Sequence, residues 1–303
     1  MEVDVFVPLL LPLAGWPVAR WLAPRLSPRA ASWVLTGCAL VLAVGSTSAL
    51  ALLTARGLAR VPWVASLGGF GDSSFEDVNV PLAATSGVAL IAAATALAWA
   101  GVQYVRRHRR INAELDAHGT DEVVLLPGAE PIAFAVAGRG GRIAVSSGLL
   151  AVLDARERRA LFAHERAHLA LRHHFFAAAL TIATALNPLL RPLGTAARFA
   201  LERWADETAA ARVGDRRVVA TAVAKAALAG KTGRSPVLAA AGGPVPQRVR
   251  ALLTPRSPKG PLAALAIAAV LAVCGASAAN ALDAAIDLHL GVELAQSAYP
   301  HGH

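Results

Sequence analysis

The sequence predicts an α-helical membrane protein that carries one α+β domain between its third and fourth transmembrane helices. Of its 303 residues, 55% are hydrophobic and only 16% are charged, whereas a soluble domain of this size has about 25% charged residues. The apolar residues gather in four runs, three of which reach the ~20 residues that a helix needs to cross the hydrocarbon core. Between the third and fourth runs lies a stretch of mixed composition, long enough for a domain with its own core.

The four predicted transmembrane helices differ in how well they fit the bilayer. They cover approximately 5–19, 31–55, 80–104 and 261–282, and the last three contain no charged residue. The first run is shorter and contains three prolines, which interrupt helices. It is preceded by Glu2 and Asp4, whereas a signal peptide begins with basic residues. We therefore interpret it as a membrane segment and not as a signal peptide.

Arginine and lysine residues predict the orientation of these helices. They gather between the first two spans, after the third span and before the fourth, at Arg20, Arg25, Arg29, Arg106, Arg107, Arg109, Arg110, Arg256 and Lys259. The loop between the second and third spans instead carries Asp72, Glu76 and Asp77. Since basic loops stay in the cytoplasm, we expect a plasma-membrane protein with both termini outside and a cytoplasmic domain at 106–258. Residues 259–303 then hold the fourth span and a short outer tail.

The net charge of +9 is of the kind seen in nucleic-acid-binding proteins. Here, however, the basic residues cluster where the spans meet the cytoplasm, so the expected partner is the anionic surface of the lipid bilayer, with no direct nucleic acid binding. The two cysteines, Cys38 and Cys274, both fall inside predicted spans. They form neither a disulfide framework nor a Cys-x-x-Cys metal site, and we interpret them as packing residues.

The cytoplasmic domain is predicted to begin with strands and to continue with helices. Val123–Leu126 forms a strand before a Pro-Gly break, and Ile132–Ala137 and Arg142–Ser146 flank the glycine-rich "GRGG" of a hairpin. "DARE" at 154–157 has the pattern of a capping box, so a helix begins near Ala155 and runs past His168. A second helix covers Leu193–Val213. Residues 175–190 are too few for a span, and we interpret them as a helix that packs against the bilayer or dips into it.

The first of these helices carries the sequence "HERAH". On a helix, residues i and i+4 share a face, so His164 and His168 can reach one metal ion. Zinc takes imidazole and carboxylate ligands, with an open position for water in catalytic sites. It lowers the pKa of that water, and Glu165 is placed to take the proton. The alternative is a solvated helix face, and His173 and His174 farther along are interpreted as structural.

The second helix offers a third ligand within "ERWAD". Glu202 and Asp206 are again four residues apart and share a face. One carboxylate can bind zinc while the other accepts a hydrogen bond from a ligand imidazole and fixes its tautomer. Such a placement of E-x-x-A-D after H-E-x-x-H makes coincidence less probable than the first motif alone.

The stretch from "AFAVAGRGGRIAVSSG" through "HERAHLALRHH" to "ERWADETAA" resembles the integral-membrane gluzincin proteases. The chain is most similar to the BlaR/MecR-type antirepressors, metallopeptidase family fifty-six, over residues 120–252, and less similar to the HtpX/Ste24 group. The resemblance implies a zincin-type (gluzincin) domain with His164, His168 and Glu202 as zinc ligands, Glu165 as general base and Asp206 as partner of a ligand imidazole. It also implies that an edge strand, Ala133–Val136 or its hairpin partner, pairs with the substrate, the alternative being a strand with no part in substrate binding.

The sequence departs from these relatives at two places that bear on mechanism and signalling. The domain holds no tyrosine to stabilise an oxyanion, and Arg248 is the candidate for that role, the alternative being a structural salt bridge. Only about 20 residues follow the last span, where the BlaR/MecR proteins carry a penicillin-binding sensor, so β-lactam sensing is not expected.

Three functions remain open from the sequence. The first is a zinc-dependent endopeptidase that cleaves a protein substrate, a small DNA-binding repressor by analogy with BlaR/MecR and therefore with a part in signal transduction. The second is a quality-control protease of HtpX/Ste24 type. The third is a catalytically silent signalling scaffold, against which the complete set of His164, Glu165, His168 and Glu202 argues.

Overall fold

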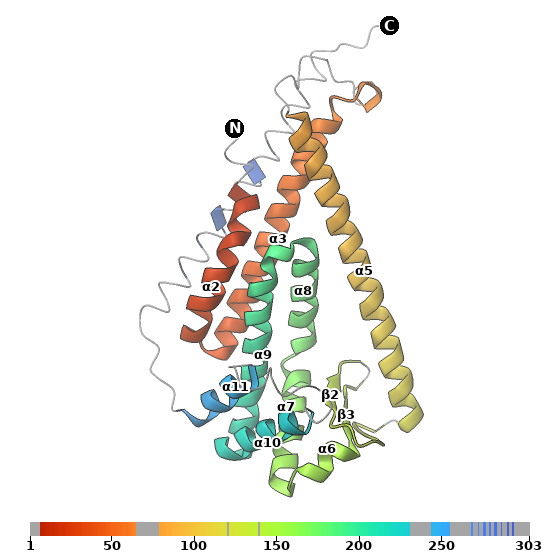
Figure 1. Cartoon of the computed structure of the whole chain (residues 1–303), viewed down its shortest axis with the longest axis vertical. Coiled ribbons are helices and arrows are strands. Elements are labelled where there is room, and N and C mark those ends of the chain that lie inside the picture. Colours follow the sequence, from red (N-terminus) through yellow and green to blue (C-terminus); the bar gives the residue numbers. More distant parts are fainter. Residues whose placement is uncertain are drawn as a thin grey trace.

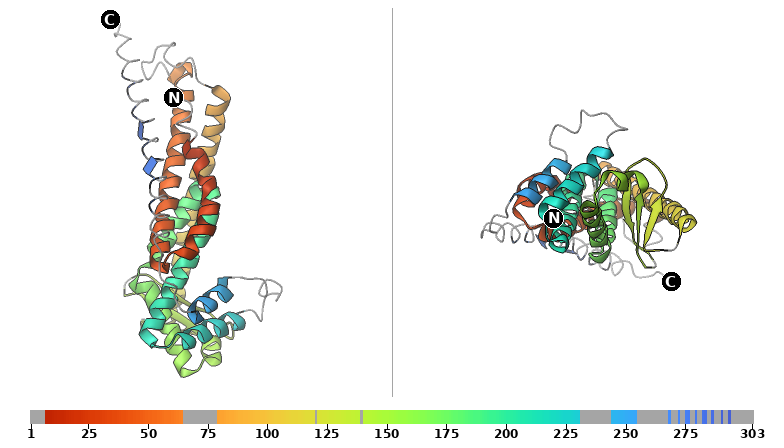
Figure 2. Two further views of the ribbon diagram at one scale, coloured as in Figure 1. Left: turned by 90° about the vertical axis from the view of Figure 1, so that its left-hand side faces the viewer. Right: turned by 90° about the horizontal axis from the view of Figure 1, so that it is seen from below.

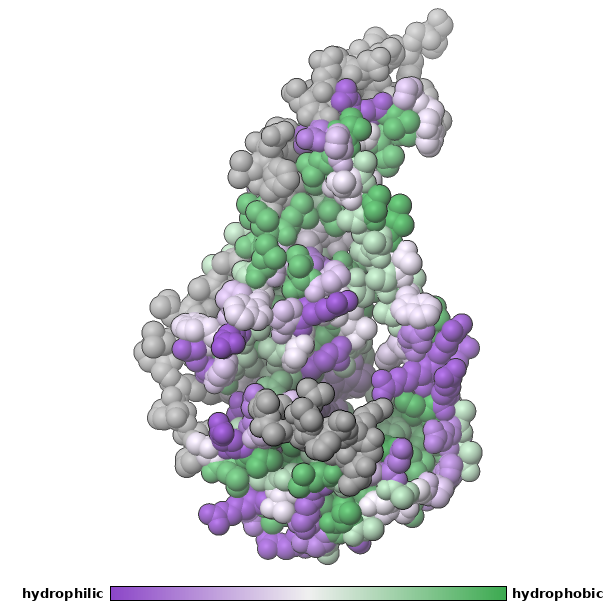
Figure 3. All heavy atoms as spheres, viewed as in Figure 1, coloured by the Kyte–Doolittle hydropathy of each residue, from purple (hydrophilic) through white to green (hydrophobic). Residues whose placement is uncertain are grey.

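The computed structural model describes residues 7–64, 79–119, 121–138, 140–230 and 244–254, together with single residues between 268 and 293. Long helices lie side by side in an elongated upper part, and shorter helices and a small sheet form its lower end (Figure 1). Apolar residues dominate the surface of the upper part, and hydrophilic residues gather around the lower end and the lower part of the long helix α5 (Figure 3). The predicted fourth span, 261–282, falls largely outside the described residues.

Two helices are long and apolar enough to cross a membrane: α3, Pro28–Leu58, and α5, Val80–His118. In each, the side chain of a capping residue, Ser27 or Asn79, accepts a hydrogen bond from the first helical turn, and a proline, Pro28 or Pro81, occupies the first or second helical position. They contain the predicted second and third spans. The described residues therefore do not confirm four transmembrane helices.

The first predicted span is not one continuous helix. Residues 11–25 instead form the short elements η1 (Leu11–Ala14), α2 (Gly15–Leu22) and η2 (Ala23–Arg25). Prolines fall inside these elements and interrupt the helical hydrogen bonds. Buried side chains of α2 and α3 pack against α8 (His173–Leu186) and α9 (Arg191–Val213) in one apolar core.

Helix α5 is longer than the span predicted for it and continues to His118. Its last turns carry the exposed Arg106, Arg107, Arg109 and Arg110 and then reach the sheet, where Leu115 is 1% exposed in a small core with Val124 and Val136. One helix thus connects the apolar upper part to the lower end.

The sheet has the strand order β1-β3-β2, with β1 at Val123–Leu126, β2 at Ala133–Val136 and β3 at Arg142–Ser146. Strands β2 and β3 form the predicted antiparallel hairpin, and β1 pairs with β3 in parallel. Strand β2 is therefore an edge of the sheet.

The helices of the lower end follow the sheet: α6 (Ser147–Val152), α7 (Ala155–Ala170), α10 (Arg216–Ala229) and α11 (Pro244–Leu253). From below, the sheet lies on one side of α7, and α10 and α11 lie on the other (Figure 2). Small buried side chains, among them Ala160 and Ala163 of α7 and Ala220 of α10, let these helices approach closely.

Between α7 and α10 the chain makes a helical hairpin. Helix α8, His173–Leu186, rises into the upper part, η4 (Pro188–Leu190) turns the chain, and α9, Arg191–Val213, returns to the lower end (Figure 1). A Cβ at Gly194 would stand 2.9 Å from a methyl carbon of Thr184, so glycine permits the close approach of the two helices. Helices α7 and α8 are long and apolar enough to cross a membrane only as a pair, and the pair is bent by 63° at the break between them.

Candidate metal centre

Helix α7 holds the H-E-x-x-H motif at the point where it faces α9. Its first turn is fixed by the predicted capping box, in which Asp154 accepts hydrogen bonds from the first turn and Glu157 accepts one from the backbone of Asp154. The helix ends at Ala170, just after His168. The side chains of His164 and His168 lie on one face, and their Nε2 atoms are 3.1 Å apart.

Helix α9 brings Glu202 to the same point. Its carboxylate oxygens lie 3.7 Å from Nε2 of His164 and 3.5 Å from Nε2 of His168. The ligand atoms of these three residues all lie within 4.8 Å of one another. The sequence prediction that these side chains meet is therefore consistent with the geometry.

These distances suit a zinc ion. Two ligand atoms that are about 2.0–2.2 Å from one tetrahedral ion lie roughly 3.3–3.6 Å from each other, close to the separations just given. Two imidazoles and a carboxylate are also a donor set that zinc takes in catalytic sites. The side chain of Glu202 is 40% exposed, so the site is open to solvent on that side.

Asp206 and Arg248 form a charged layer behind the three candidate ligands. Asp206, which is 2% exposed, lies 3.0 Å from Nδ1 of His164, although this nitrogen has no well-aligned hydrogen bond. Arg248 of α11 donates two hydrogen bonds of 2.7 Å to Asp206 and lies 2.9 Å from Glu202. Arg248 therefore contacts the carboxylates of Glu202 and Asp206, which matches the salt-bridge alternative, and its oxyanion role stays a prediction.

The charges around His164 control its protonation. Burial lowers the pKa of His164, but the carboxylates of Asp206 and Glu202 outweigh burial and raise it to about 9. Burial, together with the charge of His164, lowers the pKa of His168 to about 4. Since a metal ligand must be a neutral imidazole, a metal ion at this site competes with the proton of His164.

Glu165 is buried between α7 and the edge strand. Its side chain is turned away from bulk water, with the residue 7% exposed, and burial raises the pKa of its carboxyl group. The backbone N–H of Ala135 on β2 interacts with this carboxylate and acts in the opposite direction. Glu165 thus lies beside β2, an outer strand of the sheet.

His173 is part of this site, which the sequence did not indicate. Its Nδ1 lies 3.0 Å from Nδ1 of His168, and its ring packs against Trp204 at a centroid distance of 5.1 Å. In a straight helix, residue 173 would point about 140° away from residue 168. The left-handed conformation of Arg172, with φ of 54°, breaks the helix and returns His173 toward His168. No spacing rule of a continuous helix predicts this contact.

The family model of peptidase family M48 matches residues 102–189, which include all of α7. No significant match was found among curated proteins or among solved structures. The match supports a metallopeptidase of M48 type and does not support family fifty-six, so the predicted assignment to the BlaR/MecR family is not upheld. Since peptidases of family M48 are zinc metalloendopeptidases, the chain is a zinc metalloendopeptidase.

Proposed function

We propose that His164, His168 and Glu202 hold the zinc ion of this peptidase and that Glu165 is its general base. The observation that carries the proposal is the convergence of three ligand atoms within 4.8 Å from two helices. A bound zinc ion supplies Lewis acidity, which polarises a peptide carbonyl and lowers the pKa of water. Glu165 accepts the proton of the attacking water, and its raised pKa brings it nearer the operating pH, as a general base requires.

The outer edge of β2 is the proposed docking place for the substrate. An extended peptide can add to an open sheet edge through backbone hydrogen bonds. Because the N–H of Ala135 on this strand interacts with Glu165, a peptide paired with Ala133–Val136 would run past the general base. Recognition through the backbone suits an enzyme that cleaves extended segments of proteins.

His173 is proposed to position His168. A neutral imidazole has one donor and one acceptor nitrogen. If His168 binds the metal through Nε2, its Nδ1 carries the hydrogen and donates it to Nδ1 of His173, which is 3.0 Å away. His173 is 3% exposed and enclosed by aromatic rings, so it holds this orientation. Asp206 has the corresponding place beside His164.

Replacing His173 tests this role through zinc affinity. His173→Phe removes the acceptor, and we expect zinc affinity to fall by about 10–100-fold, as is typical for partners of metal ligands. In His173→Asn the side-chain oxygen takes the place of Nδ1, so most of the affinity should remain. The measurement is chelator competition on the full chain in detergent. His174→Asn is the control, because His174 has no contact with the three proposed ligands. Equal affinity in wild type and His173→Phe would show that His168 does not depend on this contact.

The position of the site indicates where its substrates lie. Helix α9 carries Glu202 and also packs, through Leu193 and Ala197, in the apolar core with α3. The exposed arginines at 106–110 lie where α5 passes from apolar to hydrophilic surroundings. Under the positive-inside rule this end faces the cytoplasm. We therefore propose a peptidase that works at the cytoplasmic surface of the membrane.

Two classes of substrate fit such a site. One is a small DNA-binding repressor, which rests on the BlaR/MecR resemblance alone. The other is a segment of a membrane protein, as in quality control of HtpX/Ste24 type. We favour the membrane protein, because the site lies next to the apolar helices and because family fifty-six is not supported. The hypothesis of a catalytically silent scaffold is not supported, because the chain matches a family of active metallopeptidases.

A substrate trap separates these classes. Glu165→Gln is expressed in the native host and purified from the membrane, and the co-purifying proteins are identified by mass spectrometry against wild type and Glu202→Ala. We expect several membrane proteins to be enriched in the trap only. Enrichment of one small DNA-binding protein would instead establish the repressor. Equal capture by Glu165→Gln and Glu202→Ala would show that binding does not depend on the metal centre.

A further inference from the structure

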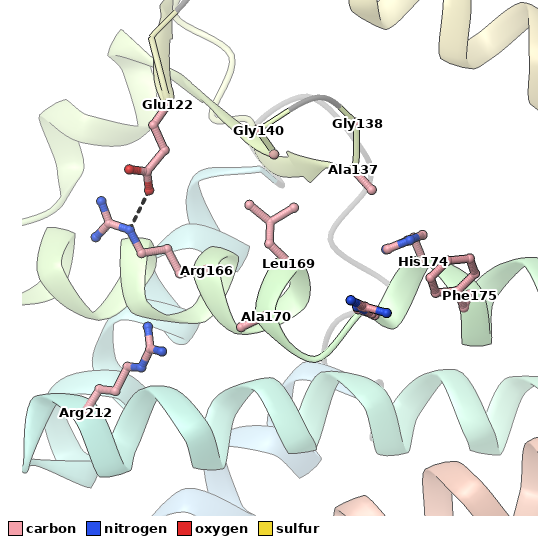
Figure 4. A pocket seen from close by; sticks show the side chains of 12 residues that line it. Glu122, Ala137, Gly138, Gly140, Arg166, Leu169, Ala170, His174, Phe175 and Arg212 are labelled. Carbon is pink, nitrogen blue, oxygen red and sulfur yellow. Dashed lines mark hydrogen bonds and ion pairs between the residues drawn. The ribbon is translucent and has the colours of Figure 1, made fainter.

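A pocket lies on the side of α7 that faces away from the proposed metal ligands. Its volume is about 740 Å³, and it is bordered by the β2–β3 loop, the end of α7, the start of α8 and the end of α9 (Figure 4). Arg166 and Ala170, which line it, each follow one of the motif histidines by two residues and so point about 200° away from it. The pocket is therefore separate from the proposed zinc site.

Three arginines from different elements line this pocket: Arg166, Arg172 and Arg212. Arg166 donates to Glu122 at 2.8 Å, and both side chains remain about half exposed. In the described part of the chain, neither Arg172 nor Arg212 has an ion-pair partner, and both are exposed. One carboxylate thus faces three guanidinium groups, and the pocket carries an excess of positive charge.

The backbone around the pocket also favours an anion. Gly138 and Gly140 line it, and a Cβ at either position would meet nothing within 4 Å, so a ligand can approach their backbone closely. On another side, His174 belongs to the first turn of α8, which has no side-chain cap, while the N–H of Phe175 in the same turn donates to the carbonyl of Arg172 at 3.0 Å. The uncapped N–H groups of a helix start attract phosphate.

The pocket borders an apolar surface that faces away from the protein. Phe175 lines the pocket and is 61% exposed, and Ile182 is 43% exposed. These residues are seven apart and so lie on one face of α8. Helix α8 packs against α3 and α5, the two candidate membrane spans. A ligand with a charged end in the pocket could therefore extend an apolar part along α8.

We propose that this pocket binds the phosphate-bearing head group of an anionic lipid. Arginine is suited to phosphate because its planar guanidinium donates two parallel hydrogen bonds. Arg172 and Arg212 supply these donors, and the acyl chains lie along Phe175 and Ile182. The bound lipid would hold the end of α7 and the start of α8 in their bent arrangement at the membrane surface. This proposal does not rest on the assignment of the zinc ligands.

The test is lipid binding to the full chain in neutral detergent, followed by native mass spectrometry. Dioleoyl phosphatidylglycerol is titrated against dioleoyl phosphatidylcholine. We expect wild type to prefer phosphatidylglycerol and Arg172→Gln/Arg212→Gln to bind it roughly 30-fold more weakly, since each basic residue near a membrane surface contributes about 1 kcal/mol. Melting temperatures confirm folding, and Arg212→Gln alone serves as a milder variant if the double variant is unstable.

The matched control is Arg159→Gln/Arg217→Gln, which removes the same charge from exposed helix positions outside the pocket. Its phosphatidylglycerol affinity should equal that of wild type. An equal loss in both double variants, or no preference for phosphatidylglycerol, would overturn the proposal. If inorganic phosphate stabilises wild type but not the pocket variant, and displaces the lipid at low millimolar concentration, the pocket binds free phosphate and the lipid is not its ligand.

Discussion

Glu165→Gln should reduce the kcat/KM for cleavage of fluorescein-labelled β-casein by about 10³-fold, within the ~10²–10⁴-fold range for loss of a general base. Glutamine has nearly the same shape but cannot accept the proton of water at neutral pH. The buried position of Glu165 beside β2 is then kept, so the loss should appear in kcat and not in KM. The assay uses the full chain in detergent.

Zinc content distinguishes this result from a damaged site. Metal analysis should give the same zinc content for Glu165→Gln as for wild type, because the three proposed ligands are unchanged. Glu130→Gln, an exposed glutamate in the loop before β2, should keep full activity. An active Glu165→Gln enzyme that retains its zinc would assign the general base to another residue.

Glu202→Ala should remove zinc from the protein. With only His164 and His168 left as ligands, we expect zinc affinity to fall by more than ~10²-fold. The binding free energy of a structural zinc site, ~10–16 kcal/mol, comes from only a few ligands, so each of them contributes several kcal/mol. Casein cleavage should disappear with the metal. Chelator competition measures the affinity, and metal analysis of the purified protein gives the stoichiometry.

This variant also removes one partner of Arg248, so its effect on folding must be known. Arg248 retains its two hydrogen bonds to Asp206, and we expect the melting temperature of the variant to equal that of zinc-stripped wild type. Glu130→Ala is the matched control for the loss of a carboxylate. If Glu202→Ala bound zinc as tightly as wild type, the third ligand would be a different residue.

The elements that carry the metal centre were predictable because their signals are local. The capping box at Asp154 and Glu157 marked the start of α7, and Gly214, with φ of 76°, ends α9 as predicted. Periodicity of four residues placed two histidines on one helix face and two carboxylates on another. Strand β1 has the predicted bounds. Strands β2 and β3 form the predicted hairpin on either side of the glycine-rich segment.

What the sequence did not reveal depends on tertiary structure. The contact of His173 with His168 requires a break at Arg172, and arginine carries no turn signal. Arg248 reaches the site from α11 only because α11 packs on α9 and α10, and no local pattern encodes that packing. The match to family M48 supports the metallopeptidase class but not the finer BlaR/MecR assignment, because H-E-x-x-H and E-x-x-A-D are shared among gluzincin families.

Helix α9 is one continuous helix that connects the apolar helices of the upper part to the candidate metal centre. It runs unbroken for 23 residues, about 35 Å, with Leu193 buried among the apolar helices at one end and Glu202 and Asp206 farther down. Its two ends cannot turn independently. A rotation of about 10° at a side-chain radius of ~6 Å moves a carboxylate by roughly 1 Å, and a misplacement of that size can cost about 10²-fold in rate. A change in bilayer thickness or lateral pressure that rotates α9 would therefore move Glu202, the proposed third ligand.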